Sequence, residues 1–206
     1  MRAETGNDDA IAEYEYFEAG GQDFSKQLNK IKKSGVEQVI LGGDMTDSAN
    51  IINQAAKMGI KVQFLGGSDW GSDEFKELLN KSVTSDYIAF VQFFAYDGDE
   101  ATKVVSKEKE IFLKAYKKNH SRRAEPADPV ALGYDAYCLA LDAINKAPEG
   151  ATTEDIKDMI TGPQYQFEGA TGLINFSSIG DPMKTAYIST WVEGKVNTLY
   201  TIEPVE

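Results

Sequence analysis

The sequence predicts an α/β fold built on a doubly wound layer of parallel strands and helices, and two observations support this. Over the first ninety residues, short apolar runs alternate with segments of helical spacing, the order that places helices beside a parallel sheet. Within them, residues 36–70 have the pattern of strand, helix and strand that is typical of a right-handed βαβ unit with parallel strands. The strands end in Gly42-Gly43 and Gly66-Gly67, so both pairs are expected at the carboxyl edge of one sheet, where open α/β sheets bind ligands.

The first half of the chain is expected to hold strands and helices in regular alternation. Period-two alternation predicts the first strand, and apolar spacings of three and four predict the helices. Asp23 is expected to cap the first helix, and Gly35 and Gly59 are expected to end the first and second helices. In chain order these elements are strand 11–17, a helix between Asp23 and Gly35, strand 36–41, helix 47–57, strand 61–65, a short helix beginning at Ser72 or Asp73, and strand 87–94.

The second half is predicted to be mainly helical until its last strands. Two apolar runs separated by Glu193-Gly194 indicate a closing hairpin. The expected elements are a charged helix over 100–118, a polar loop over 119–128, an apolar helix over 129–146, a helix over 153–160 capped by Thr153, a turn over 167–172, strand 173–176, a turn over 180–182, and strands 185–192 and 195–202.

The helices of the second half have too little sheet to pack against. They are amphipathic to apolar, yet the only strand expected near residues 100–160 is strand 173–176. This stretch therefore looks like half a domain whose sheet is supplied from elsewhere.

Composition and motifs exclude several classes of function. The chain has 206 residues, of which 42% are hydrophobic, enough for a core in one large domain or two small ones. Its net charge of -12 argues against nucleic acid and anionic membranes as main partners. No apolar run is long enough to cross a bilayer and the N-terminus has no signal-peptide pattern, so either the protein is cytosolic or a targeting segment has been removed. No metal or cofactor is predicted, because His120 and Cys138 are single and no phosphate-binding glycine motif is present.

Seven short motifs share one order and spacing from about Tyr14 to the C-terminus. They are Tyr16-Phe-Glu, Asp23-Phe-Ser-Lys-Gln-Leu, Ile52-Asn-Gln-Ala-Ala-Lys-Met-Gly-Ile60, Leu65-Gly-Gly-Ser-Asp-Trp70, Leu132-Gly-Tyr-Asp-Ala136, Phe167-Glu-Gly-Ala-Thr-Gly-Leu-Ile-Asn-Phe176 and Gly180-Asp-Pro182. Together they resemble the type I solute-binding proteins of branched-chain amino-acid ABC transporters, the Leu/Ile/Val-binding-protein-like family. Each motif alone is weak, and the specificity lies in their order.

The resemblance implies the type I periplasmic-binding-protein fold: two Rossmann-like lobes with parallel sheets, joined by crossing strands, with the ligand in the cleft between them. This chain resembles only the C-terminal half of that fold. Residues 11–92 with 185–206 would form a nearly complete ligand-binding lobe. Residues 93–184 would form the helical part of the other lobe, which lacks its N-terminal sheet and the Ser/Thr-rich site for the ligand carboxylate.

The resemblance also implies a function, a location and partners. The expected role is to bind a small amino acid, of branched-chain type by family default, and to deliver it to the permease subunits of an ABC transporter without enzymatic chemistry. The expected location is extracytoplasmic, either in the periplasm or lipid-anchored at the outer face of the cell membrane.

In the family, an acidic residue after the Leu-Gly-Gly strand pairs with the α-ammonium of the ligand, usually in the order Gly-Gly-Asp-Gly-Trp. Residues 66–70 read Gly-Gly-Ser-Asp-Trp, so Ser68 occupies the family position and Asp69, one place later, is the leading candidate. A charge-assisted hydrogen bond from a sheltered carboxylate to an ammonium is worth roughly 1.5–3 kcal/mol. The structural alternative is that Asp69 only caps the helix beginning near Ser72.

The other candidate ligand contacts each have a structural alternative. Asp44 follows the preceding strand, where the family carries ligand-contacting residues, but it could simply cap helix 47–57. Trp70 could stack on the ligand or its cation, or close the lobe, and Gly67 lies beside it. Tyr134 and Asp135 resemble family residues near the cleft, and Phe94 lies near the crossing point, although aromatic residues in such places are more often part of the core.

Two other functions compete with ligand binding. A receiver-like or hydrolase domain would use Asp44 as a nucleophile at a strand end, although the acidic pair and lysine of a receiver are not found. A truncated fragment would not bind ligand alone. It would form a homodimer by segment exchange or pair with a missing N-terminal half, since exposed apolar helix faces favour association.

Overall fold

A computed structural model describes residues 11–95, 106–120 and 125–204 of the chain. The chain divides into two compact units, and it passes from one to the other within β-strands. Unit 1 comprises residues 1–90 and 190–197, and unit 2 comprises residues 91–189 and 198–206. The strands that contain these passages are β3 (Ile88–Gln92), β7 (Ala186–Val192) and β8 (Lys195–Ile202).

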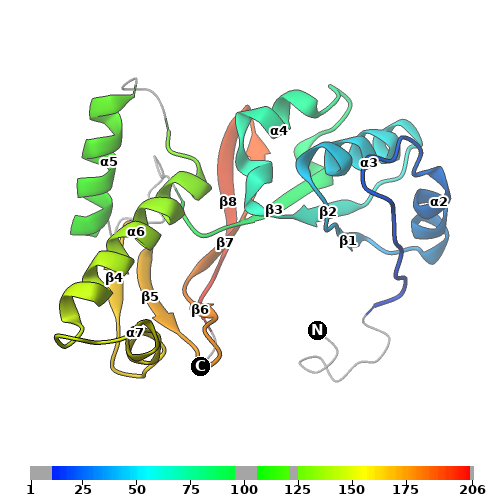
Figure 1. Cartoon of the computed structure of the whole chain (residues 1–206). Helices are drawn as coiled ribbons and strands as arrows, with labels where there is room; N and C mark the ends of the chain where they lie inside the picture. The colour runs from blue at the N-terminus through cyan, green and yellow to red at the C-terminus, as the bar shows by residue number, and fades with distance from the viewer. Residues whose placement is uncertain (1–10, 96–105, 121–124, 205–206) are drawn as a thin grey trace. The chain divides into compact units, whose positions relative to one another are not determined.

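The strands β1 (Gln38–Ile40), β2 (Gln63–Gly66) and β3 are parallel neighbours in a five-stranded sheet with the order β1-β2-β3-β7-β8 (Figure 1). The predicted βαβ unit is therefore confirmed. The turn Glu193-Gly194 between β7 and β8 has positive φ at both residues, 51° and 77°, as the tight turn of a hairpin requires.

Helices pack on the strands of unit 1 around one buried core. The α-helices are α2 (Ser25–Ser34), α3 (Met45–Lys57) and α4 (Asp73–Leu78), and the short 3-10 helices are η2 (Ser68–Gly71) and η3 (Ser85–Tyr87). Gly35 and Gly59, with φ of 71° and 64°, follow α2 and α3 as predicted. The buried apolar residues of this core are Phe24, Leu28, Ala49, Ile51, Ile52, Ala55, Ile60, Val62, Phe64, Trp70, Phe75, Ile88 and Phe90.

The strand predicted over residues 11–17 does not form. The Tyr16 carbonyl accepts a hydrogen bond from Nε2 of Gln27 in α2 at 3.0 Å, instead of one from a neighbouring strand. Phe17 packs edge-on against Phe24, whereas Tyr16 remains 80% exposed. The alternation of residue types over this segment is not enough to make it a strand. A strand forms only where a sheet edge can take up its backbone hydrogen bonds.

Unit 2 combines helices with a small antiparallel sheet of the order β4-β5-β6 (Figure 1). The turn predicted over 167–172 was too long, since residues 167–169 form a strand that places Phe167 opposite Ile174. Pro182, predicted in a turn, begins another strand. The elements are α5 (Lys107–Asn119), α6 (Asp128–Lys146), α7 (Thr153–Ile160), β4 (Phe167–Gly169), β5 (Gly172–Phe176) and β6 (Pro182–Met183).

Thr152, not Thr153, caps α7. Its hydroxyl accepts the Asp155 amide at 3.2 Å, and the Asp155 carboxylate accepts the Thr152 amide at 2.8 Å, which is a reciprocal capping box. For the charged helix predicted over 100–118, the structure shows α5 beginning at Lys107, and residues 100–105 lie outside the described residues.

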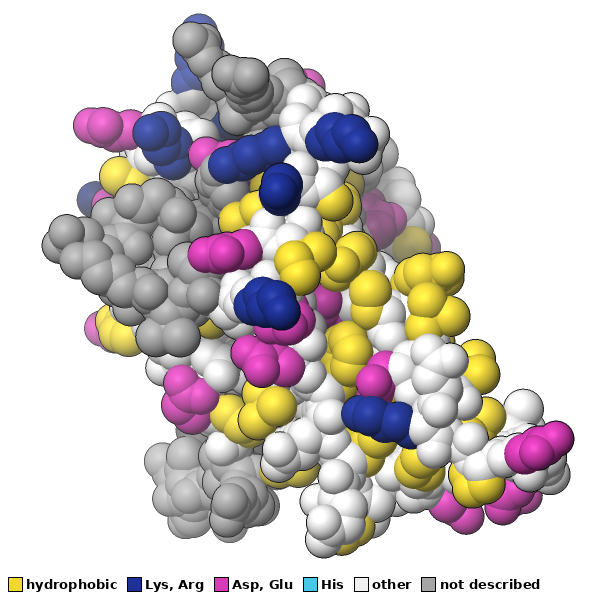
Figure 2. Space-filling model, turned by 90° about the vertical axis from the view of Figure 1, so that its left-hand side faces the viewer, with side chains coloured by type: hydrophobic (Ala, Val, Ile, Leu, Met, Phe, Trp, Pro, Cys, Tyr) yellow, Lys and Arg dark blue, Asp and Glu magenta, His cyan; other side chains and the backbone are white. Residues whose placement is uncertain are grey.

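The helix α6 is buried on its polar side and exposed on an apolar side. The buried side holds Asp128, Ala131, Asp135 and Ala143. The other side carries the α6 stripe, four residues that are 44–66% exposed: Val130, Tyr137, Leu141 and Ile144. Their spacing of seven, four and three places them on one face of the helix. Figure 2 views the face on which α6 lies and shows hydrophobic side chains gathered there in a band.

The described part of unit 2 lacks a sheet that covers the α6 stripe, as the shortage of predicted strands indicated. Its buried core cluster contains only Phe94, Phe112, Ala131 and Ala170, compared with thirteen residues in unit 1. Among the described helices, none has the length and apolar character needed to span a membrane.

Candidate functional site

The carboxyl ends of β1 and β2 form the edge at which the sequence placed its leading candidates. Asp44 follows β1 after Leu41 and two glycines. The helix η2 follows β2 after Gly67 and carries Ser68, Asp69 and Trp70. Because β1 and β2 are parallel, both segments lie at the same edge of the sheet. We call residues 66–72 the η2 rim.

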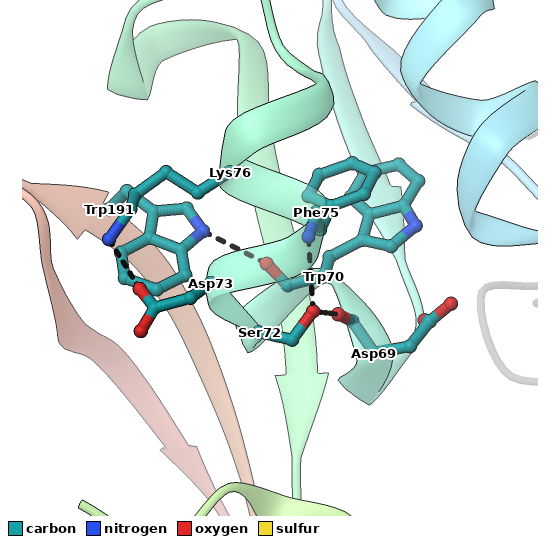
Figure 3. Close-up of polar contacts among 7 residues, drawn as sticks. All are labelled: Asp69, Trp70, Ser72, Asp73, Phe75, Lys76 and Trp191. Carbon is teal, nitrogen blue, oxygen red and sulfur yellow. Dashed lines mark hydrogen bonds and ion pairs between the residues drawn. The ribbon is translucent and has the colours of Figure 1, made fainter. Parts of the chain in front are cut away.

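Asp69 presents a half-buried carboxylate on the η2 rim (Figure 3). No described residue donates a hydrogen bond to this carboxylate or forms an ion pair with it. The carboxylate lies against Gly67, since a Cβ placed there would be 3.0 Å from Oδ1 of Asp69. Ser68, half-buried, precedes it in η2. The rim therefore offers a negative group without a protein partner among the described residues.

The capping alternative for Asp69 is wrong, because Ser72 caps α4. The Ser72 hydroxyl accepts the Phe75 amide at 3.2 Å and donates to the backbone carbonyl of Asp69 at 2.7 Å. The side chain of Asp69 takes no part in this cap.

Trp70 lies in the core of unit 1 rather than on the surface. Its indole is 1% exposed and stacks on the Phe75 ring, with 4.9 Å between centroids and 9° between planes. The ring also covers Gly66, where a Cβ would lie 2.5 Å from Cδ2 of Trp70. These contacts favour the lobe-closing interpretation of Trp70 over ligand stacking.

Asp44 caps α3. Its Oδ1 accepts the Asp47 amide at 2.8 Å, and the helix begins at Met45, two residues earlier than predicted. Asp47 is itself 2% exposed, and its carboxylate accepts the Gly20 amide at 2.8 Å. The capping alternative for Asp44 is therefore confirmed, and its exposed side chain stays a predicted ligand contact.

Phe94 and Tyr134 lie in the core cluster of unit 2. Phe94 is 3% exposed and meets the Phe112 ring edge-on at 5.6 Å, and the Tyr134 ring lies 5.0 Å from that of Phe112. Burial raises the pKa of the Tyr134 phenol, and the side chain of Cys138 raises it further. These contacts support the core interpretation of both residues.

A buried polar cluster in unit 2 was not found from the sequence. The Asp135 carboxylate, 1% exposed, accepts the amides of Ala170 and Thr171 at 2.7 and 2.8 Å and the Thr171 hydroxyl at 2.6 Å. Lys184 in turn donates to that hydroxyl. Burial lowers the pKa of the Lys184 ammonium, while the charges of Asp135 and Asp128 act in the opposite direction. The cluster holds the β4–β5 turn against α6.

Trp191 was also missed, although it contacts the η2 rim directly. Its Nε1 donates to the backbone carbonyl of Trp70 at 2.9 Å, across a separation of 121 residues (Figure 3). No local pattern signals this contact, because Trp191 reads simply as an apolar residue of a strand.

Comparison with known proteins identifies the group to which this chain is similar. A family model described as periplasmic binding protein matches residues 1–195. Leu/Ile/Val-binding protein homolog 2 of Brucella abortus is 26% identical over 185 residues, which are 88% of this chain and 46% of that protein. The leucine-, isoleucine-, valine-, threonine-, and alanine-binding protein of Pseudomonas aeruginosa is 25% identical over 83% of this chain and 42% of its own length.

Solved structures agree with these sequence relatives. A leucine-binding protein from Thermotoga maritima has a TM-score of 0.74 and 29% identity, covering 91% of this chain and 51% of that chain. A branched-chain amino acid transporter substrate binding protein from Streptococcus pneumoniae, solved in complex with isoleucine, has a TM-score of 0.67 and 30% identity over the same shares. The chain thus spans about half the length of the proteins that it matches.

Proposed function

Because the chain belongs to the periplasmic binding protein family, we propose that it binds a small amino acid as part of the extracytoplasmic solute-binding component of an ABC transporter. The relatives named for leucine, isoleucine and valine support a branched-chain amino acid as the ligand. Permease subunits of the transporter are the proposed protein partners. The binding is noncovalent, so the proposed role is not enzymatic.

The observation that carries the proposal is the carboxylate of Asp69. It is half-buried at the carboxyl edge of β2, and it has no partner among the described residues. An ammonium is the group that such a carboxylate binds best, by charge-assisted hydrogen bonding in a site sheltered from water. We therefore assign the α-ammonium of the ligand to Asp69, with Ser68 and Gly67 beside it.

The hydrolase alternative has less support. The carboxylate of Asp44 already accepts the Asp47 amide at the start of α3, a structural task that accounts for its position. In residues 11–95, 106–120 and 125–204, no three His, Cys, Asp or Glu side chains cluster so as to hold a metal ion.

Calorimetric titration of this chain tests the assignment of the ligand ammonium to Asp69. The two ligands are L-leucine and 4-methylpentanoate, which is leucine without its amine. The variant Asp69→Asn should bind leucine roughly 10- to 150-fold more weakly, as expected from the loss of a charged hydrogen bond of about 1.5–3 kcal/mol. Its affinity for 4-methylpentanoate should not fall. The control Asp86→Asn makes the same chemical change at an exposed residue of unit 1 and should leave both affinities unaltered. Unchanged leucine binding by Asp69→Asn would remove Asp69 from the site.

We further propose that this chain acts as one half of a longer binding protein. Two observations support this: the chain spans about half of the proteins that it matches, and the α6 stripe is uncovered. The proposed occupant of the stripe is the sheet-forming half of the same protein that this sequence does not include. In its absence, the stripe favours association between copies.

A further inference from the structure

We infer that Trp191 is a positioning residue that fixes the backbone from which the Asp69 carboxylate extends on the η2 rim. The inference rests on the proposed function, in which this carboxylate binds the ligand ammonium. Trp191 lies on β7, and its indole N–H donates to the carbonyl of Trp70, the residue next to Asp69, at 2.9 Å (Figure 3). The bond ties a segment near the C-terminus to a rim that belongs to the first half of the chain.

The backbone of the η2 rim is held from two sides. On one side, Ser72 donates to the Asp69 carbonyl from its amide at 3.1 Å and from its hydroxyl at 2.7 Å. On the other side, the Trp70 carbonyl receives the indole of Trp191. A 3-10 helix of four residues leaves its last carbonyls without partners of its own, so a donor from another element is needed to fix them.

The Asp69 side chain can rotate, but this backbone sets the point from which its carboxylate reaches a ligand. No described residue bonds to its carboxylate, so no side-chain contact can correct a shift of the rim. Its Oδ1 already lies close to Gly67, and a rotation of the Asp69–Trp70 peptide would change how the carboxylate meets a ligand. An interaction that holds the Trp70 carbonyl therefore acts on ligand binding through Asp69.

Trp191 is itself fixed in place, so it can serve as an anchor. Its ring lies 6.1 Å from that of Phe90, and the Lys76 ammonium lies over it at 4.7 Å from the centroid. The preceding residue, Thr190, donates from its hydroxyl to the Ile88 carbonyl at 2.7 Å, which attaches β7 to β3. The indole is thus presented to the rim by the central part of the sheet.

The variant Trp191→Phe separates the hydrogen bond from the packing, because it keeps an aromatic ring under Lys76 and removes the N–H. Amide hydrogen exchange of the full chain should accelerate roughly two- to tenfold at Trp70 and Ser72, with no change in the amides of α3, as expected for the loss of one hydrogen bond. The ratio of the affinity for L-leucine to the affinity for 4-methylpentanoate should fall by a similar factor. If the role of Trp191 were purely structural, the substitution would lower the affinity for both ligands equally and leave the ratio of the two affinities unchanged.

Lys76→Met is the matched control, since it removes the cation over the ring and its pairing with Asp73 but leaves the indole bond. Exchange at the rim and the preference for leucine should both stay within twofold of the wild type. An effect as large as that of Trp191→Phe would assign the positioning to general packing and overturn the inference.

The outcomes for the inference and for the proposed function can be told apart. Unchanged exchange at Trp70 and Ser72 in Trp191→Phe overturns the inference, whatever the ligand results. If the wild-type chain binds no leucine, the proposed function of this chain is contradicted. Amide hydrogen exchange at Trp70 and Ser72 still decides whether Trp191 holds the η2 rim. If Trp191→Phe does not fold, NMR of the wild type decides, because the chain has two tryptophans and hence two indole N–H signals. A protected Trp191 indole supports the bond, and one that exchanges like a free indole overturns it.

Discussion

Gly66 and Gly67 are adjacent on the η2 rim, but an added Cβ would meet a different neighbour at each of them. A Cβ on Gly66 would meet the buried indole of Trp70, which cannot move because it stacks on Phe75. A Cβ on Gly67 would instead meet the end of the Asp69 side chain, which can rotate. Gly42, which follows β1, has nothing within 4 Å of its Cβ position. A Cβ on Gly43, the other glycine after β1, would lie 2.7 Å from Cζ of Phe17. Sterics therefore disfavour a side chain at Gly43 and Gly66 and leave room for one at Gly42.

Gly66→Ala should lower the free energy of unfolding by about 1–3 kcal/mol, because the added methyl group overpacks the core against Trp70. Urea denaturation followed by tryptophan fluorescence measures the change. Gly42→Ala is the matched control and should alter stability by less than about 0.5 kcal/mol. Equal effects of the two substitutions would contradict the close contact.

At the scale of the element, some helices begin at a polar cap and others do not. The cap predicted at Asp23 is wrong, because α2 begins after Phe24 with no side-chain cap, and Asp23 instead accepts the Ser25 amide at 2.9 Å. Asp44, Ser72, Ser106 and Thr152 each accept a backbone amide three residues later. The choice between Thr152 and Thr153 could not be made from residue type, since both are threonine. It was decided by Asp155, which lies three residues after Thr152 and completes the capping box.

Thr152→Ala should destabilise α7 by about 1 kcal/mol through loss of the cap, whereas Thr153→Ala should cost much less. Amide hydrogen exchange across α7 reports the difference locally, without requiring global unfolding. Both residues are exposed, so core packing does not complicate the comparison. A larger effect at Thr153 would place the cap one residue later and restore the sequence-based assignment.

At the scale of the whole molecule, the two units differ in how completely their apolar surfaces are covered. Unit 1 buries a core of thirteen apolar residues around parallel strands, whereas the core cluster of unit 2 is much smaller. The α6 stripe remains exposed on the side opposite to Asp135 and Ala131. A helix whose apolar side faces solvent normally packs against another element. The uncovered stripe therefore agrees with a chain that spans about half the length of its relatives.

The double substitution Leu141→Gln and Ile144→Gln should reduce association of the chain, because it makes half of the α6 stripe polar. Light scattering after size-exclusion chromatography, over a range of concentrations, should show the wild type shifting to larger species and the variant remaining monomeric. Stability should change by less than about 1 kcal/mol, since both side chains are exposed. The control Leu78→Gln, at an equally exposed leucine of α4, should associate like the wild type. A wild-type chain that stays monomeric at every concentration would contradict the proposed role of the stripe.

The candidate site was predictable only in part. The position of Asp69 at the carboxyl end of β2 follows from strand periodicity and from the parallel pairing of a βαβ unit, both of which are local. That no described residue pairs with its carboxylate does not follow from the local sequence, because the neighbouring Ser72 hydroxyl donates to the Asp69 carbonyl and not to the carboxylate. Trp191 lies 121 residues from Trp70, and its strand pattern carries no mark of its hydrogen bond.

By itself, the sequence determined most of the alternation of strands and helices, the parallel βαβ unit and the closing hairpin. These features depend on periodicity and on turn residues such as Gly59 and Gly194, which act over a few positions. Only the tertiary structure decided that residues 11–17 form no strand, that Asp135 holds the β4–β5 turn and that Trp191 holds the η2 rim. Each of these depends on which distant group meets a backbone donor or acceptor, and that is set by packing rather than by local pattern.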